Sequence, residues 1–133
     1  MRRLSALAAV LALGACAQPQ PPPCQAPLKP ALQVDLYFGR DTPKGELTEA
    51  EWAAFLAEVV TPRFPDGLSV IDVAGQHRTP PGTIVREKTK LLVVVVFDAP
   101  AHRQKVEAIV EAYNVRYGQH GVFRTEREVC AAF

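Results

Sequence analysis

The sequence predicts an α+β domain in which two helices cover one face of a four-stranded antiparallel sheet. Two observations lead to this fold class. Four segments have the apolar pattern of strands and two have the spacing of amphipathic helices, and they follow one another in the order β-α-β-β-α-β. The chain has 133 residues, which is enough for one such domain after an N-terminal leader and a linker.

The first half of the domain contains one strand and one helix. Residues 34–38 alternate between apolar and polar side chains, which indicates a half-buried strand. A polar loop, residues 40–47, follows it. Thr48 and Glu51 have the spacing of a capping box, and apolar residues then recur at helical spacing. We expect this helix to stop at Thr61, because the residue before a proline disfavours the α conformation.

The second half repeats this pattern with two more strands. Residues 68–74 are rich in β-branched side chains and predict a second strand, and residues 91–97 are apolar at every position. Such a run is typical of a central strand that is buried on both faces. Asp98 is expected to cap a second helix over residues 99–117, with Gly118 as its C-terminal stop. Residues 122–131 have mixed polarity and predict a fourth strand at a sheet edge.

This element order suits the ferredoxin-like arrangement, with the spatial strand order 4-1-3-2 and both helices on one face. The other face must then meet water, a ligand or another protein. Either Val93, Val95 and Phe97 or their alternates lie on that face, the alternates being Leu92, Val94 and Val96. Exposed apolar surface of this kind marks a contact, and we expect a homodimer or another envelope protein there.

The N-terminus has the layout of a secretory signal peptide over residues 1–15. A positive start precedes an apolar run that is too short for a permanent membrane helix of roughly 20 residues. Leu13-Gly14-Ala15-Cys16 resembles the lipobox of bacterial lipoproteins, which implies acyl chains such as palmitate on Cys16 and anchoring to a membrane. In a Gram-negative host, Ala17 implies the outer membrane, facing the periplasm. A plain signal peptide that ends by chance in a cysteine is the alternative.

The lipidated cysteine opens a proline-rich linker, residues 16–30, which precedes a single domain at residues 31–133. We expect an extended spacer, with recognition of the prolines by a partner as the alternative. Once Cys16 is assigned to lipid, Cys24 and Cys130 remain as an even pair in a compartment that permits disulfides. We expect them to bridge, because the first and last strands are neighbours in the predicted sheet. A redox role is the other interpretation.

Several blocks of the domain together resemble the uncharacterised bacterial family catalogued as domain of unknown function 3574. The resemblance covers about residues 31–131 and is carried by Trp52, Phe55, Leu36-Tyr37-Phe38-Gly39-Arg40, Thr61-Pro62-Arg63-Phe64-Pro65, Gly75-Gln76 and Arg86-Glu87. Members of the family often look like lipoproteins. The resemblance implies no activity and no catalytic residues.

Composition and motifs argue against several classes of function. The histidines His77, His102 and His120 have no metal-binding spacing, and we expect His102 to be a solvated surface residue. We expect no metal, no cofactor and no catalytic residues. Of the 15 basic residues, Arg2 and Arg3 leave with the leader, so that 13 remain against 14 acidic residues. A near-neutral domain without a basic stripe is not expected to bind nucleic acid.

One group of polar residues is a candidate ligand site. The ends of the first two predicted strands and the start of the third share one edge of the sheet, where these residues could converge: Arg40, Gln76, His77, Arg78, Arg86 and Glu87. Arginines in such a cluster would bind a carboxylate or phosphate. Alternatively, Arg78 or Arg86 pairs with Glu87 and only holds the hairpin. The sequence therefore leaves two functions open, a partner-binding or self-associating lipoprotein and a small periplasmic enzyme or anion-binding protein.

Overall fold

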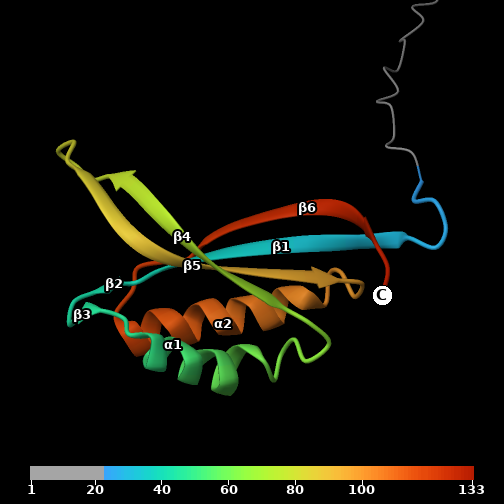
Figure 1. Ribbon diagram of the computed structural model, residues 1–133, viewed down its shortest axis with the longest axis horizontal. Coiled ribbons are helices and arrows are strands. Elements are labelled where there is room, and N and C mark those ends of the chain that lie inside the picture. The colour runs from blue at the N-terminus through green and yellow to red at the C-terminus, as the bar shows by residue number, and fades with distance from the viewer. Residues whose placement is uncertain (1–22) are drawn as a thin grey trace, which may run out of the picture.

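The computed structural model describes residues 23–133 and shows a four-stranded antiparallel sheet with two helices against one of its faces (Figure 1). The predicted α+β class, the antiparallel sheet and the two helices are confirmed. The predicted signal peptide, Cys16 and the linker up to Pro22 lie outside the described residues. Within the described part of the chain, no helix has the length and hydropathy needed to cross a membrane.

The sheet contains four long strands in the order β4-β5-β1-β6, and every neighbouring pair is antiparallel. Their bounds are β1 Lys29–Gly39, β4 Ser69–Arg78, β5 Ile84–Val96 and β6 Phe123–Ala131. A separate hairpin, β2 (Asp41–Thr42) and β3 (Gly45–Glu46), forms within the segment predicted as a loop. Because β2 and β3 of this hairpin are numbered with the rest, the strand labels of the large sheet differ from those in the expected order 4-1-3-2, which counted four strands. The apolar strand β5 is central, as its composition indicates.

The end of the linker is part of the folded structure. β1 begins at Lys29, before the expected boundary at residue 31, and Pro30 faces Cys130 in the register with β6. Cys24 and Cys130 form a disulfide with their Cα atoms 5.6 Å apart. The neighbouring first and last strands bring the two cysteines together, which is the geometry expected from the sequence.

Helix α1 (Glu49–Phe55) begins at the predicted capping box. The backbone N–H of Glu51 donates to Thr48 Oγ1 at 3.2 Å, and the backbone N–H of Thr48 donates to Glu51 Oε2 at 2.8 Å. The helix continues as one π-helical segment, η1 (Leu56–Val60), and ends before Pro62 as predicted. Local side-chain chemistry at the start and a proline at the end therefore define this element.

Helix α2 (His102–Tyr117) starts later than the sequence predicts. Asp98 does not cap it: the N-cap is Ala101, and the Asp98 carboxylate instead accepts a 2.9 Å hydrogen bond from Lys105 Nζ. The reason is that Ala99 precedes Pro100 and is therefore disfavoured in the α conformation. The predicted C-terminal stop is confirmed, because Gly118 has a φ of 64° in the left-handed region.

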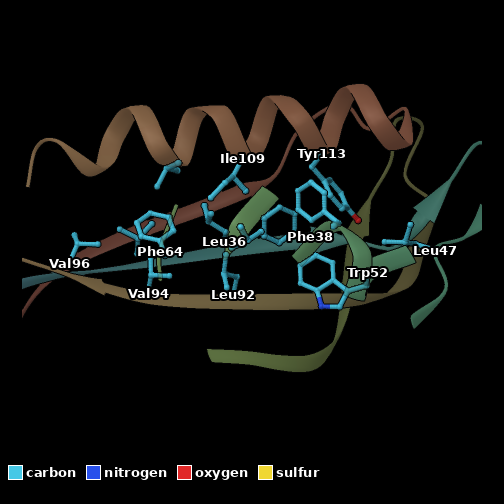
Figure 2. Close-up of a cluster of buried hydrophobic side chains, with 14 residues drawn as sticks. Leu36, Phe38, Leu47, Trp52, Phe64, Leu92, Val94, Val96, Ile109 and Tyr113 are labelled. Atoms are coloured by element: carbon cyan, nitrogen blue, oxygen red, sulfur yellow. The ribbon is translucent and has the colours of Figure 1, made fainter. Parts of the chain in front are cut away.

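The hydrophobic core lies between the helices and one face of the sheet (Figure 2). It contains Leu36 and Phe38 of β1, with side chains of α1, α2 and β5: Trp52, Phe55, Val106, Ile109, Tyr113, Leu92, Val94 and Val96. Because Leu36 faces Leu92 in the register, the even-numbered residues of β5 point toward the helices. This decides the alternative that the sequence left open, and Val93, Val95 and Phe97 belong to the other face.

We call that second face, opposite the helices, the open face. Alternation along each strand and the pairing register define its members. They are Lys29, Ala31, Gln33, Asp35, Tyr37, Gly39, Ser69, Ile71, Val73, Gly75, His77, Val85, Glu87, Thr89, Leu91, Val93, Val95, Phe123, Thr125, Arg127, Val129 and Ala131. Phe97 follows the last residue of β5 and lines a cavity on this face together with Val93 and Val95. Among the elements of residues 23–133, no helix covers this face (Figure 1).

Candidate functional site

The structure brings some but not all of the six residues predicted for an anion site together: Gln76 and Glu87 line one cavity with His77 and another with Arg86. Strand alternation places His77 and Glu87 on the open face, whereas Arg78 and Arg86 lie on the helix side of the β4–β5 hairpin. Gln76 pairs with Arg86 in the register and shares its side. These residues lie at one end of the sheet, as the sequence predicts, but on its two different faces.

Arg40, the sixth residue, is buried directly after β1 and its guanidinium is occupied. Only 7% of its side chain is exposed, and its Nη1 donates to Glu49 Oε1 at 2.6 Å. Nε donates to the carbonyl oxygen of Leu47 at 2.9 Å, and Nη2 donates to the same oxygen. Glu46 adds an ion pair at 3.5 Å. Arg40 therefore holds the β2–β3 hairpin and the start of α1 against the sheet.

Lys90, on the helix side of β5, forms a second buried ionic contact that sequence reasoning missed. Its side chain is 4% exposed, and its Nζ lies 2.7 Å from Glu49 Oε2 and 2.5 Å from Asp72 Oδ1. The hydrogen bonds from Lys90 hold the pKa of both carboxyls below their usual values. Burial opposes the charge of Lys90, but these two hydrogen bonds outweigh it and raise its pKa. The cluster joins β4, β5 and α1 and serves the fold.

His102 also departs from its predicted environment. It is 1% exposed rather than solvated, because the first turn of α2 lies against the edge strand β6. Its Nε2 lies 3.2 Å from Glu126 Oε1, and its Nδ1 has no hydrogen-bond partner among residues 23–133. This pair fastens the start of α2 to β6.

The open face contains a cavity of about 530 Å³ near the β4–β5 hairpin, which we call the open-face cavity. Its lining includes the backbone of Gly39 and Gly75 and the side chains of Thr89 and Glu87. The segment after α2 contributes Gln119, Gly121 and Phe123, and β1 contributes Tyr37. Of the residues predicted from the sequence, Gln76, His77 and Glu87 line it.

The carboxylate of Glu87 lies over the backbone of Gly39. A Cβ atom at Gly39 would be 2.6 Å from Glu87 Oε2, so that only glycine leaves room for this arrangement. The Glu87 side chain is 21% exposed, and its ionisable neighbour is His77, whose Nδ1 is 3.8 Å from Glu87 Oε1. The sequence does carry a signal for this grouping: Glu87 and Thr89 are two positions apart in β5, and alternation along a strand puts such residues on the same face.

Next to the cavity, the open face is largely apolar with one buried acid at its centre. Ile71 is 49% exposed, Phe123 69% and Val95 38%. Asp35 is 8% exposed, and its carboxylate accepts hydrogen bonds from Gln33 Nε2 at 2.8 Å and from Thr125 Oγ1 at 3.5 Å. Within residues 23–133, the open face thus combines a cavity that contains a carboxylate with an apolar surface that no other element covers.

Comparison with known families gives a match over most of the chain. The family model described as protein of unknown function (DUF3574) matches residues 33–133. The chain belongs to this family. The resemblance seen in the sequence is therefore confirmed, and the open-face cavity and the apolar surface lie within the family's domain. No curated protein matches the sequence.

Solved structures with a similar fold come from distant proteins. A phage SAM lyase in complex with S-methyl-5'-thioadenosine has a TM-score of 0.57 and 11% identity, covering 77% of this chain and 90% of that chain. The phage SAM lyase in its apo state has a TM-score of 0.55 and 12% identity, covering 76% and 84%. CutA from Synechococcus elongatus PCC7942 has a TM-score of 0.50 and 11% identity, covering 77% and 80%. At these identities the likeness concerns the fold alone.

Proposed function

We propose that this family member is a cell-envelope lipoprotein whose domain binds a second copy of itself through the open face. One observation carries the proposal. Among residues 23–133, four exposed large hydrophobic side chains gather on this one face: Ile71, Val95, Phe97 and Phe123. Contiguous exposed apolar surface on a soluble domain marks a contact, because its burial is favourable by about 25 cal/mol per Å².

The proposal includes the ferredoxin-like arrangement of the sheet. When only the strands of the large sheet are counted in chain order, the order β6-β1-β5-β4 reads fourth, first, third, second. Both helices pack on one face of this sheet, which leaves the other face free for a contact (Figure 1). This topology supports a ferredoxin-like domain with one covered and one open face.

The size and charge of the open face suit a weak contact between two copies. Four strands of about nine paired residues cover roughly 600 Å², somewhat less than the roughly 800 Å² per partner of a standard interface. The face carries both signs of charge, Glu87 on β5 and Arg127 on β6. A two-fold partner presents the same surface, so these opposite charges allow attraction across the contact.

The proposed lipid anchor makes a weak contact effective. Acyl chains on Cys16 would confine the domain to a membrane surface, in a Gram-negative host the outer membrane facing the periplasm. Confinement raises the effective concentration of one copy near another without any new contact. Mass spectrometry of protein from the native host tests this part, with an acylated N-terminal Cys16 as the expected result. An unmodified Cys16 thiol would contradict it.

Sedimentation equilibrium of residues 23–133, which retain Cys24 and its disulfide, tests the self-association. We expect a monomer–dimer equilibrium that the combined change Ile71→Asp and Val95→Asp shifts to monomer. Val115→Asp is the matched control, because Val115 is 80% exposed on α2, away from the open face. A monomer at every concentration up to the millimolar range contradicts self-association, as does equal dimerisation of the double variant. If a different envelope protein binds to the open face instead, that protein, and not a second copy of this chain, is the partner.

A further inference from the structure

We propose that the open-face cavity binds a small organic cation, with its protonated amine on Glu87 and its apolar body against Tyr37 and Phe123. The lining comes entirely from one chain. Binding needs no residue of a second copy, but Tyr37 and Phe123 also belong to the face proposed to self-associate, so the two proposals are tested by separate variants. It also reverses the ligand charge expected from the sequence, which was anionic.

The distribution of charge around the cavity favours a cation. Arg78 and Arg86 lie on the other side of the sheet, and the guanidinium of Arg40 is bound to Leu47 and Glu49. The ionisable side chains that remain in the lining, apart from the Tyr37 phenol, are Glu87 and His77.

The Glu87 carboxylate has room for a cationic partner. Its side chain is 21% exposed, so that it is largely removed from water, and His77 Nδ1 at 3.8 Å lies beyond hydrogen-bond distance. A carboxylate in this condition gains more from an N–H donor that carries positive charge than from a neutral donor.

The two glycines near this carboxylate are required by a lack of space for a side chain, and the backbone conformation does not require them. Neither Gly39 nor Gly75 has a positive φ, so another residue would be compatible with the backbone at both positions. A Cβ atom would lie 2.6 Å from Glu87 Oε2 at Gly39 and 3.1 Å from Thr89 Oγ1 at Gly75. The two glycines therefore let the polar groups of Glu87 and Thr89 lie close to the sheet, within the cavity lining.

An aromatic pair provides the surface for the apolar part of the ligand. The rings of Tyr37 and Phe123 have centroids 5.5 Å apart, and Phe123 is 69% exposed. Aromatic faces attract cations and stack with planar groups. Gln119 Nε2 donates to the carbonyl oxygen of Asp41 at 2.6 Å, which fixes the segment after α2 beside the cavity.

The structure favours an organic cation over a metal ion as the ligand of this cavity. Within residues 23–133 no three His, Cys, Asp or Glu side chains come together as a metal site would require. The cavity volume of about 530 Å³ lies in the range of small-molecule sites, roughly 300–1,000 Å³. An ammonium group on an aromatic or aliphatic body of moderate size fits both facts.

The test uses three matched probes on the purified protein, expressed from its full chain. The probes are phenethylammonium, neutral 3-phenylpropanamide and anionic 3-phenylpropionate, and binding is followed by the NMR shifts of the amides of Gly39, Gly75 and Thr89. We expect only the ammonium to bind with a saturable shift. Glu87→Gln should weaken its binding by at least about tenfold, as expected for the loss of a charge-assisted hydrogen bond. Glu107→Gln is the control, because Glu107 is exposed on α2.

A second variant keeps the Glu87 carboxylate but fills the space in which it lies. Gly39→Ala should displace the Glu87 carboxylate and weaken ammonium binding, while the melting temperature changes little because the displaced group is the end of a flexible side chain. No shift with 10 mM ammonium, equal binding of 3-phenylpropionate, or unchanged affinity in Glu87→Gln would each overturn the inference. Ile71 and Val95 do not line the cavity. The Ile71→Asp and Val95→Asp variant should therefore still bind the ammonium, which separates this result from the test of self-association.

Discussion

The hydroxyl of Tyr113 in α2 donates a 2.7 Å hydrogen bond to the carbonyl oxygen of Gly39 at the end of β1. The same ring packs edge-on against Phe38, with centroids 4.8 Å apart, and against Phe55, at 5.2 Å. Gly39, over which the Glu87 carboxylate lies, is thus bound on its other side by a core residue. This link explains how the helix layer positions the floor of a cavity on the opposite face of the sheet.

Tyr113→Phe is expected to lower the free energy of unfolding by about 1 kcal/mol, because the Gly39 carbonyl loses its buried donor while the ring packing stays. Urea denaturation followed by circular dichroism measures the loss. Tyr117→Phe is the control, since the hydroxyl of Tyr117 donates to the exposed end of α1, at Glu51 O, and its removal should cost less. An unchanged midpoint for Tyr113→Phe would contradict a stabilising role.

Stability should fall in alkaline solution in a way that depends on Tyr113. Burial raises the pKa of this phenol well above its usual value of 10.0. Above pH 10 the unfolded chain releases the phenolic proton while the folded chain retains it. The stabilising contribution is therefore complete below pH 10 and is lost as the pH rises further. Tyr117 and Lys90, whose pKa values are also raised, act in the same direction.

The comparison with Tyr113→Phe isolates the effect of this one phenol. The free energy of unfolding, measured between pH 9 and pH 11, should fall less steeply with pH in the variant than in the parent protein. Parallel slopes would show that Tyr113 titrates alike in the folded and unfolded states.

Arg40→Ala should destabilise the domain by about 2 kcal/mol, because the Leu47 carbonyl loses its donors and the buried stem of the arginine leaves a void. Arg86→Ala removes an exposed side chain and should change stability by less than about 0.5 kcal/mol. Thermal or urea unfolding of both variants provides the comparison. Equal stabilities would mean that Arg40 is not a structural residue, and the sequence-based anion hypothesis would regain support.

Loss of the Cys24–Cys130 disulfide should lower the free energy of unfolding by about 4 to 5 kcal/mol, because it links residues 106 positions apart and restricts the unfolded chain. Residues 23–133 with both cysteines changed to serine, compared by urea unfolding with the parent fragment, measure the effect. A cost below about 1 kcal/mol would show that pairing of β1 with β6 alone is sufficient at this end of the sheet.

The sequence by itself determined those features that depend on neighbouring residues. The Thr48 and Glu51 capping box, the stop before Pro62 and the left-handed Gly118 all follow from local backbone chemistry, and all are present in the structure. The Asp98 cap failed for an equally local reason, the proline at position 100. The apolar run of β5 correctly indicated a central strand. The expected burial on both faces was wrong, because Val95 on the open face is 38% exposed.

Only the tertiary structure decided which side of the sheet each residue of β5 occupies. An all-apolar strand lacks the alternating polar residues that would mark its solvent-facing side. The pairing of Leu92 with Leu36, which points toward the helices, settled the choice. Alternation along β5 also puts Glu87 and Arg86 on opposite faces of the sheet. The expected anion site is therefore replaced by a cavity that contains a carboxylate. Burial of Arg40 depended on Leu47 and Glu49, which reach it through a hairpin. Contacts of this kind depend on packing in three dimensions, and the spacing of residues along the chain does not specify them.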